Sequence, residues 1–174
     1  MHHHHHQQQQ QQQHSTRILN SQDTDSLLSN FPTTRLSYEA SIHKNDKPSI
    51  ASEYKCFILP KGRRCIAWAT EWKRNKIFAV IDIDGANNRD RDRDRGQERT
   101  ISPIIRKFHQ DNGWFPGKVR IYDVCFDRSL VYGTVFGGVL FRMNDEHMSQ
   151  TQFFSIHTIY WYKGNPVPSL TAGG

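Results

Sequence analysis

Histidines and carboxylates are the residues of this chain that could ligate a metal or carry protons, and their spacing favours neither role. The histidines outside the N-terminal tract form no H-x-x-x-H pattern and no cluster with cysteine; they are His43, His109, His147 and His157. Asp82 and Asp84 could bind a metal as a pair, but they precede a Gly-Ala-Asn-Asn turn, and residues that end a strand explain them more simply. We therefore predict no metal site.

Cysteines and enzyme motifs give no further lead. Cys56, Cys65 and Cys125 are odd in number and widely spaced, which argues against a disulfide framework and a four-thiolate zinc site. Each lies in an apolar run, so we expect three small buried residues. The sequence has no G-x-S-x-G motif, no P-loop and no G-x-G-x-x-G, and so gives no support to a hydrolase or a dinucleotide enzyme.

Composition limits the size of the domain and the class of partner. Of 174 residues, 36% are hydrophobic and 23% are charged, with a formal net charge of +6 that permits binding to a polyanion such as RNA. No apolar window of membrane-spanning length and no secretory signal is present, so we expect an intracellular protein without a membrane partner. We expect a His/Gln tail (1–14), a polar, flexible segment (15–49), one domain (50–168) with a charged loop at 86–100, and a flexible tail (169–174).

Six strands and one short helix are expected within this domain. The strands are runs of β-branched and aromatic residues between turn signals, at Tyr54–Leu59, Arg64–Thr70, Lys76–Asp82, Lys118–Phe126, Leu130–Phe141 and Gln152–Tyr162. Ser102 and Pro103 predict the start of a helix that runs to about Gln110. Glycines at 133, 137 and 138 should bend or bulge their strand. These elements predict an α+β domain of mostly antiparallel sheet with one or two short helices.

Two pairs of segments in this order resemble a known superfamily. The later pair is Tyr132–Phe141, with its Y-G-T run, and Gln152–Val167, with its Y-W-Y-K-G run; the earlier pair is Leu59–Trp68 and Lys76–Asp82. Together they resemble the motifs of covalent nucleotidyltransferases, which include mRNA capping enzymes and polynucleotide ligases. The earlier pair is at least as similar to the cap-binding domain of snurportin, and the Y-G-T and Y-W-Y-K-G runs of the later pair are also similar to those of uncharacterised proteins of large DNA viruses. The resemblance implies a fold like half of a nucleotidyltransferase nucleotide-binding domain.

The catalytic residues of that superfamily are absent when its motifs are carried over. With Gly62 matched to the motif glycine, Leu59 stands where the family has its nucleophilic lysine, although the motif arginine is kept as Arg64. Gly137, Val139 and Thr158 stand in the places of acidic residues that would bind metal or ribose. The resemblance therefore implies no enzyme, no cofactor and no catalytic residue.

What the resemblance leaves is a binding site for a nucleotide or an RNA cap. Its expected residues are Lys61, Arg63 and Arg64 as phosphate contacts, Trp68 as a stacking platform, and His157 and Lys163 as further polar contacts. For His157 an outward-facing strand position is the simpler interpretation. The alternative is a structural or interaction protein that binds no nucleotide and associates with itself or with a protein partner. It could be a viral adaptor or a virion protein, located in the host cytoplasm or in the virion.

Overall fold

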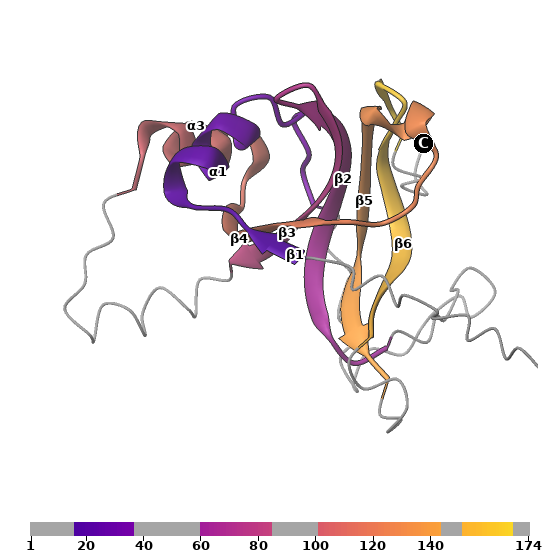
Figure 1. Cartoon of the computed structure of the whole chain (residues 1–174). Coiled ribbons are helices and arrows are strands. Elements are labelled where there is room, and N and C mark those ends of the chain that lie inside the picture. Colours follow the sequence, from indigo (N-terminus) through magenta and orange to yellow (C-terminus); the bar gives the residue numbers. More distant parts are fainter. Residues whose placement is uncertain (1–15, 37–59, 85–100, 144–150, 169–174) are drawn as a thin grey trace, which may run out of the picture.

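The computed structural model describes residues 16–36, 60–84, 101–143 and 151–168 (Figure 1). Within these ranges one antiparallel sheet has the strand order β1-β4-β3-β2-β5-β6-β7. Its strands are β1 (Thr16–Ile18), β2 (Arg63–Trp72), β3 (Asn75–Asp84), β4 (Phe115–Tyr122), β5 (Tyr132–Arg142), β6 (Gln152–Tyr162) and β7 (Asn165–Pro166). Two short helices, α1 (Ser21–Leu28) and α3 (Pro103–Asn112), lie on one face of the sheet, which confirms the predicted α+β class.

Helix α3 begins where its sequence predicts. The Ser102 hydroxyl accepts the N–H of Ile105 at 3.2 Å, and Pro103 occupies the first turn, where its missing N–H removes no hydrogen bond. Gly113 ends the helix in the left-handed conformation, with φ of 81°. The helix thereby directs Phe108 onto the sheet, where its ring packs edge-on against Trp114.

The main core lies between the helices and the sheet. Ile66 and Trp68 of β2 and Ile81 of β3 point to this helix face and are at most 2% exposed. Phe31 packs its ring edge-on against Trp68 at a centroid distance of 5.2 Å. Aromatic rings therefore pack together with aliphatic side chains such as Leu27 and Ile81 beneath α1 and α3.

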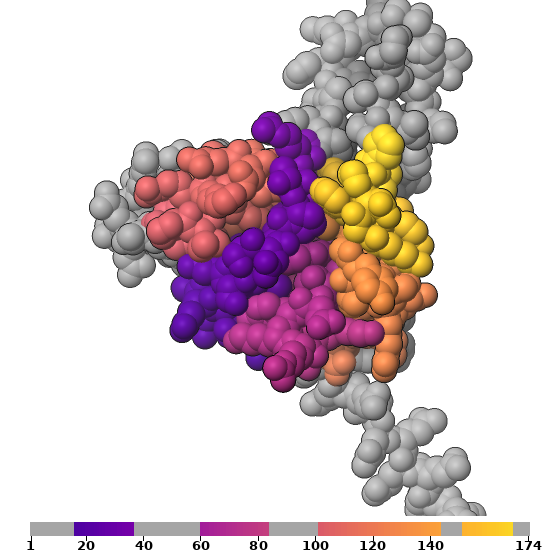
Figure 2. Space-filling model, turned by 90° about the horizontal axis from the view of Figure 1, so that it is seen from above, coloured from indigo at the N-terminus to yellow at the C-terminus, as the bar shows by residue number. Residues whose placement is uncertain are grey.

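The N-terminal boundary predicted from composition was wrong for residues 16–36. This stretch forms β1 and α1, and Leu27 and Leu28 are 1% and 3% exposed in the core. The Asn20 side chain caps α1 by accepting the N–H of Asp23 at 2.8 Å. Figure 2 shows this segment (indigo) lying across the domain between α3 and β6. Leu19 is also buried in this core, whereas Ile18 is 59% exposed, and the low overall hydrophobic content of the segment hides its few core residues from a composition-based prediction.

The other face of the sheet is curled rather than flat. The Tyr122 hydroxyl of β4 donates to Gln152 Oε1 of β6 at 2.8 Å, although three strands separate β4 from β6 in the sheet. Ala67, Val80 and Phe136 form a second small core on this concave face. The segment between β4 and β5 crosses the same face (Figure 1) and includes the short helix η1 (Arg128–Val131).

Strand boundaries agree with the prediction where signals are local. β6 has the predicted bounds, whereas β4 begins at Phe115 and ends at Tyr122, because the chain must then leave the sheet to cross to β5. Asp127 caps η1, so β5 starts at Tyr132 rather than at residue 130. Strands β1 and β7 were not predicted. The predicted strand Tyr54–Leu59, the charged loop 86–100, residues 37–49 and the two tails lie outside the described residues.

Candidate functional site

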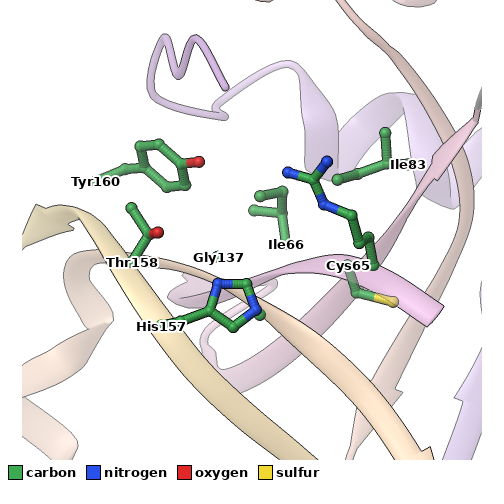
Figure 3. A pocket seen from close by; sticks show the side chains of 9 residues that line it. Cys65, Ile66, Ile83, Gly137, His157, Thr158 and Tyr160 are labelled. Atoms are coloured by element: carbon green, nitrogen blue, oxygen red, sulfur yellow. The ribbon is translucent and has the colours of Figure 1, made fainter. Parts of the chain in front are cut away.

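A small hollow opens on the helix face of the sheet above Gly137, and we call it the Gly137 hollow (Figure 3). Its lining comprises Arg64, Cys65, Ile66, Ile83, Gly137, Gly138, His157, Thr158 and Tyr160. The empty volume of the hollow, counted together with its open mouth, is about 260 Å³. The centre of a water molecule can reach only about 10 Å³ of this volume. The enclosed part therefore accommodates one water-sized group.

Strand β5 lies at the centre of the hollow, with β2 on one side and β6 on the other. Gly137 pairs with Ile66 of β2 and with Thr158 of β6. A Cβ atom at residue 137 would lie 2.9 Å from Tyr160 Cε2, so the tyrosine ring approaches the bare glycine backbone. The absence of a side chain at this position therefore allows the Tyr160 ring to pack against the strand beside the hollow.

Two bulges in β6 direct its side chains into the hollow. The register between β5 and β6 shifts between Val135 and Phe136 and again at the predicted glycine pair, which leaves Tyr160 and His157 as extra residues of β6. Regular alternation along a strand would direct His157 away from Thr158 and Tyr160, but the bulges change this, so the outward-facing interpretation of His157 was wrong. All three line the same hollow, as Figure 3 shows.

The polar groups of the hollow are neutral or positive. Nε2 of His157 is buried and has no hydrogen-bond partner among the described residues. Arg64 is exposed and lines the rim, and Thr158 and Tyr160 add hydroxyl groups. Because none of the described lining residues carries a carboxylate, the hollow suits a ligand with hydrogen-bond acceptors and negative charge.

The predicted site residues separate into two groups. Arg64 and His157 are brought together, but Arg63 is directed to the opposite face, where its guanidinium donates to Asp82 at 2.9 Å. Lys61 is exposed ahead of β2 and does not line the hollow. Lys163 lies in the turn after β6, with its Nζ 5.2 Å from the centroid of the Tyr162 ring. Because neighbouring strand residues point to opposite faces, Arg63 and Arg64 cannot contact the same phosphate group.

Trp68 does not provide the predicted stacking platform. Its side chain is 2% exposed and packs under Phe31, so no base can reach its ring. Sequence analysis did not single out Tyr160, which instead borders the hollow. The glycine pair opposite β6 was the available signal, because glycine in a strand marks a close approach by another group.

Asp82 forms an ion-pair network on the concave face. Arg120 donates to both of its carboxylate oxygens, at 2.9 and 3.0 Å, and Arg63 donates to one of them. Burial, reinforced by the charge of Asp82 beside it, raises the pKa of the Cys65 thiol to about 12. The residues described contain no group of three His, Cys, Asp or Glu side chains arranged to hold a metal ion.

Of the three cysteines expected to be buried, only Cys65 is buried in the described residues. Cys125 is exposed in the crossing segment, so the expectation of burial was wrong there, and Cys56 lies outside the described residues. The run that contains Cys125 becomes a connection rather than a strand, because β4 ends at Tyr122.

Comparison with known proteins gave no match: no family model, no curated protein and no solved structure matches this chain. Within the described residues, no helix has the length and apolar character needed to span a membrane.

Proposed function

We propose that this domain binds, without chemical conversion, a phosphate group of a nucleotide or an RNA cap at the Gly137 hollow. The observation that carries the proposal is the buried, unpartnered Nε2 of His157 in a hollow that Arg64 also lines. An unpaired buried polar atom is costly, and a ligand that pairs with it offsets that cost.

The chemistry of the lining supports phosphate over other ligands. A guanidinium matches the geometry of phosphate oxygens, and the imidazole and the hydroxyls of Thr158 and Tyr160 provide further hydrogen-bonding groups. The enclosed space takes one phosphate oxygen, so the sugar and the base would stay outside the mouth. Base recognition by Trp68 is not part of the proposal, because that ring is buried.

The absence of catalysis rests on the resemblance to nucleotidyltransferases described above. Leu59 stands at the position of the nucleophilic lysine, and Gly137 and Thr158 stand at positions of acidic residues. Incubation of the purified chain with α-labelled GTP or ATP should leave no label attached to protein after denaturation. A covalently labelled chain would contradict a purely binding role.

Calorimetric titration with GDP, a methylated cap analogue and inorganic pyrophosphate tests binding. Arg64→Ala should weaken binding by about tenfold or more, since a hydrogen bond to a charged group contributes about 1.5 to 3 kcal/mol. Arg63→Ala is the matched control: it removes the same charge from the neighbouring residue, which faces the other side of the sheet. The absence of heat with all three ligands for the folded protein, or equal losses in the two variants, would refute the proposal.

An interaction protein remains the second candidate, and β6 favours it, because only the two-residue strand β7 pairs with its outer side among the described residues. Its eleven residues, Gln152–Tyr162, contain no Asp, Glu, Lys, Arg or Pro, although such residues commonly protect a free strand edge. Ile156 and Ile159 on this strand are 49% and 42% exposed. Light scattering after size-exclusion chromatography would support this candidate if the chain forms a dimer that Ile156→Lys dissociates, and would reject it if the chain is monomeric throughout.

A further inference from the structure

A second concave region, far from the Gly137 hollow, lies where β4 leaves the sheet. β4 ends at Tyr122, opposite Phe78, whereas the stretch of β3 from Asn75 to Ile77 has no strand partner on that side among the described residues. The resulting gap, which we call the hairpin notch, is lined by side chains that include Arg17, Trp72, Lys73, Lys76, Tyr122 and Asp123. About 390 Å³ of it is open to the centres of water molecules, far more than in the hollow.

The notch opens towards both faces of the sheet. Arg17 pairs with Ile121 and shares the helix face with it, whereas Tyr122 belongs to the core of the concave face. Lys76 alternates with Phe78 of the concave-face core and therefore points to that side as well. A gap lined from both sides suits an extended chain that passes through it more than a compact ligand.

Positive charge borders the notch on both faces. Arg17 and Lys73 lie over the Trp72 ring, at 5.8 and 4.4 Å from its centroid. Lys73 is neutralised by Asp23 at 2.7 Å, but neither Arg17 nor Lys76 forms an ion pair among the described residues. Asp123 is the one carboxylate in the described lining. Arg17, on the helix face, and Lys76, on the concave face opposite Glu71 of β2, are therefore the two lining cations that no ion pair within 4 Å holds among the described residues.

We propose that the hairpin notch binds the phosphodiester backbone of a single-stranded nucleic acid. Arg17 on one face and Lys76 on the other would contact successive phosphates of a strand that crosses the sheet edge. Such contacts are electrostatic and release counterions, so binding should weaken steeply with salt. The inference does not depend on the Gly137 hollow, which has different residues and lies at the other end of β2.

Fluorescence anisotropy with a labelled oligouridylate and the full chain tests the inference. The double variant R17A/K76A should bind about tenfold more weakly at low salt, and its slope of log affinity against log salt should fall by about 0.7 for each cation removed. Lys163→Ala is the matched control, because Lys163 occupies the equivalent turn position beside Tyr162 and lies outside the notch. Thermal melts of each variant confirm folding.

The outcomes separate this inference from the proposed function. Loss of oligouridylate binding in R17A/K76A with unchanged affinity in Arg64→Ala and Lys163→Ala supports a strand in the notch. Loss in Arg64→Ala alone, equal loss in Lys163→Ala, or no binding at low salt would overturn it. Competition by polyglutamate as effective as by oligouridylate would also overturn it, since the notch would then take acidic peptides.

Discussion

Asp82 is the charged residue on which the concave face most depends. Its side chain and that of Arg120 are each only 14% exposed, and the two are joined at 2.9 Å. Asp82→Asn leaves a shielded guanidinium without its counterion, so the free energy of unfolding should fall by about 3 kcal/mol. Urea denaturation measures this change.

The control for Asp82 is an exposed ion pair of similar length. Asp111 pairs with Lys107 at 2.7 Å, but the two side chains are 43% and 71% exposed. Asp111→Asn should cost about 0.3 to 0.5 kcal/mol, as is usual for pairs four residues apart on a helix. Equal effects of the two substitutions would show that burial of the Asp82 network contributes nothing.

Cys65 and Cys125 should react differently with thiol reagents. Cys65 is 1% exposed and its pKa is raised to about 12, so almost none of it is thiolate at pH 8, whereas Cys125 is exposed. Iodoacetamide should modify Cys125 in the folded protein, and Cys65 only after unfolding. Mass spectrometry of proteolytic peptides distinguishes these sites, and rapid modification of Cys65 without denaturant would refute the prediction.

The raised pKa of Cys65 also predicts a dependence of stability on alkaline pH. The unfolded thiol loses its proton near the ordinary pKa of 9.0, whereas the folded thiol keeps it until about 12. The contribution is therefore complete below pH 9 and is lost as the pH rises towards 12. Burial raises the pKa of Tyr122 in the same direction, so Cys65→Ala should reduce the decline rather than abolish it. Unfolding curves at several alkaline pH values compare the two proteins.

The turn between β2 and β3 and the turn between β6 and β7 have the same backbone conformation, but only the second has a glycine at a position of positive φ. Lys73 and Arg74 have φ of 49° and 62°, whereas Lys163 and Gly164 adopt the same left-handed region with glycine at the second position. A non-glycine residue is strained there, so Arg74→Gly should raise the free energy of unfolding by about 0.5 to 1 kcal/mol. Thermal melting measures the gain.

Gly164→Ala is the opposing control in the second hairpin. Its new Cβ would lie 2.9 Å from the Tyr132 carbonyl oxygen at a φ of 84°. Stability should fall by about 1 to 3 kcal/mol. A destabilising Arg74→Gly would mean that the arginine side chain stabilises the turn more than its backbone strains it.

Local signals explain which elements could be predicted from sequence. Ser102 and Pro103 specify the start of α3, and the β-branched and aromatic run of β6 specifies that strand, because each signal acts within a few residues. The three-residue strand β1 forms only by pairing with β4, roughly a hundred residues away, and no local pattern announces it. Arg64 and His157 were found, but the bulge that turns His157 inward depends on how β6 pairs with β5.

At the scale of the whole molecule, residues 16–36 hold the domain together. Trp114 and Trp161 donate their indole N–H groups to the carbonyls of Thr34 and Thr33, which joins this segment to β6 and to the loop before β4. Asn112 Oδ1 accepts the N–H of Thr34. The segment is therefore a structural part of the core and not a surface extension of the domain.

Truncation tests this role directly. A chain that begins at residue 15 should unfold cooperatively, and one that begins at residue 37 should not fold, because it lacks Leu27, Leu28 and Phe31 of the core. Leu27→Ala in the full chain should lower the free energy of unfolding by about 3 kcal/mol. Circular dichroism follows both, and a cooperative melt of the shorter chain would contradict the prediction.

Phosphate binding at the Gly137 hollow is tested most directly at the nitrogen that lacks a partner. In protein labelled with ¹⁵N-histidine, the ring resonances of His157 are assigned as those that disappear from the spectrum of the His157→Gln variant. Addition of GDP should shift the Nε2 resonance of His157 in the wild type and in Arg63→Ala, and should not shift it in Arg64→Ala at the same concentration. Binding of GDP with an unmoved His157 resonance would contradict the proposal.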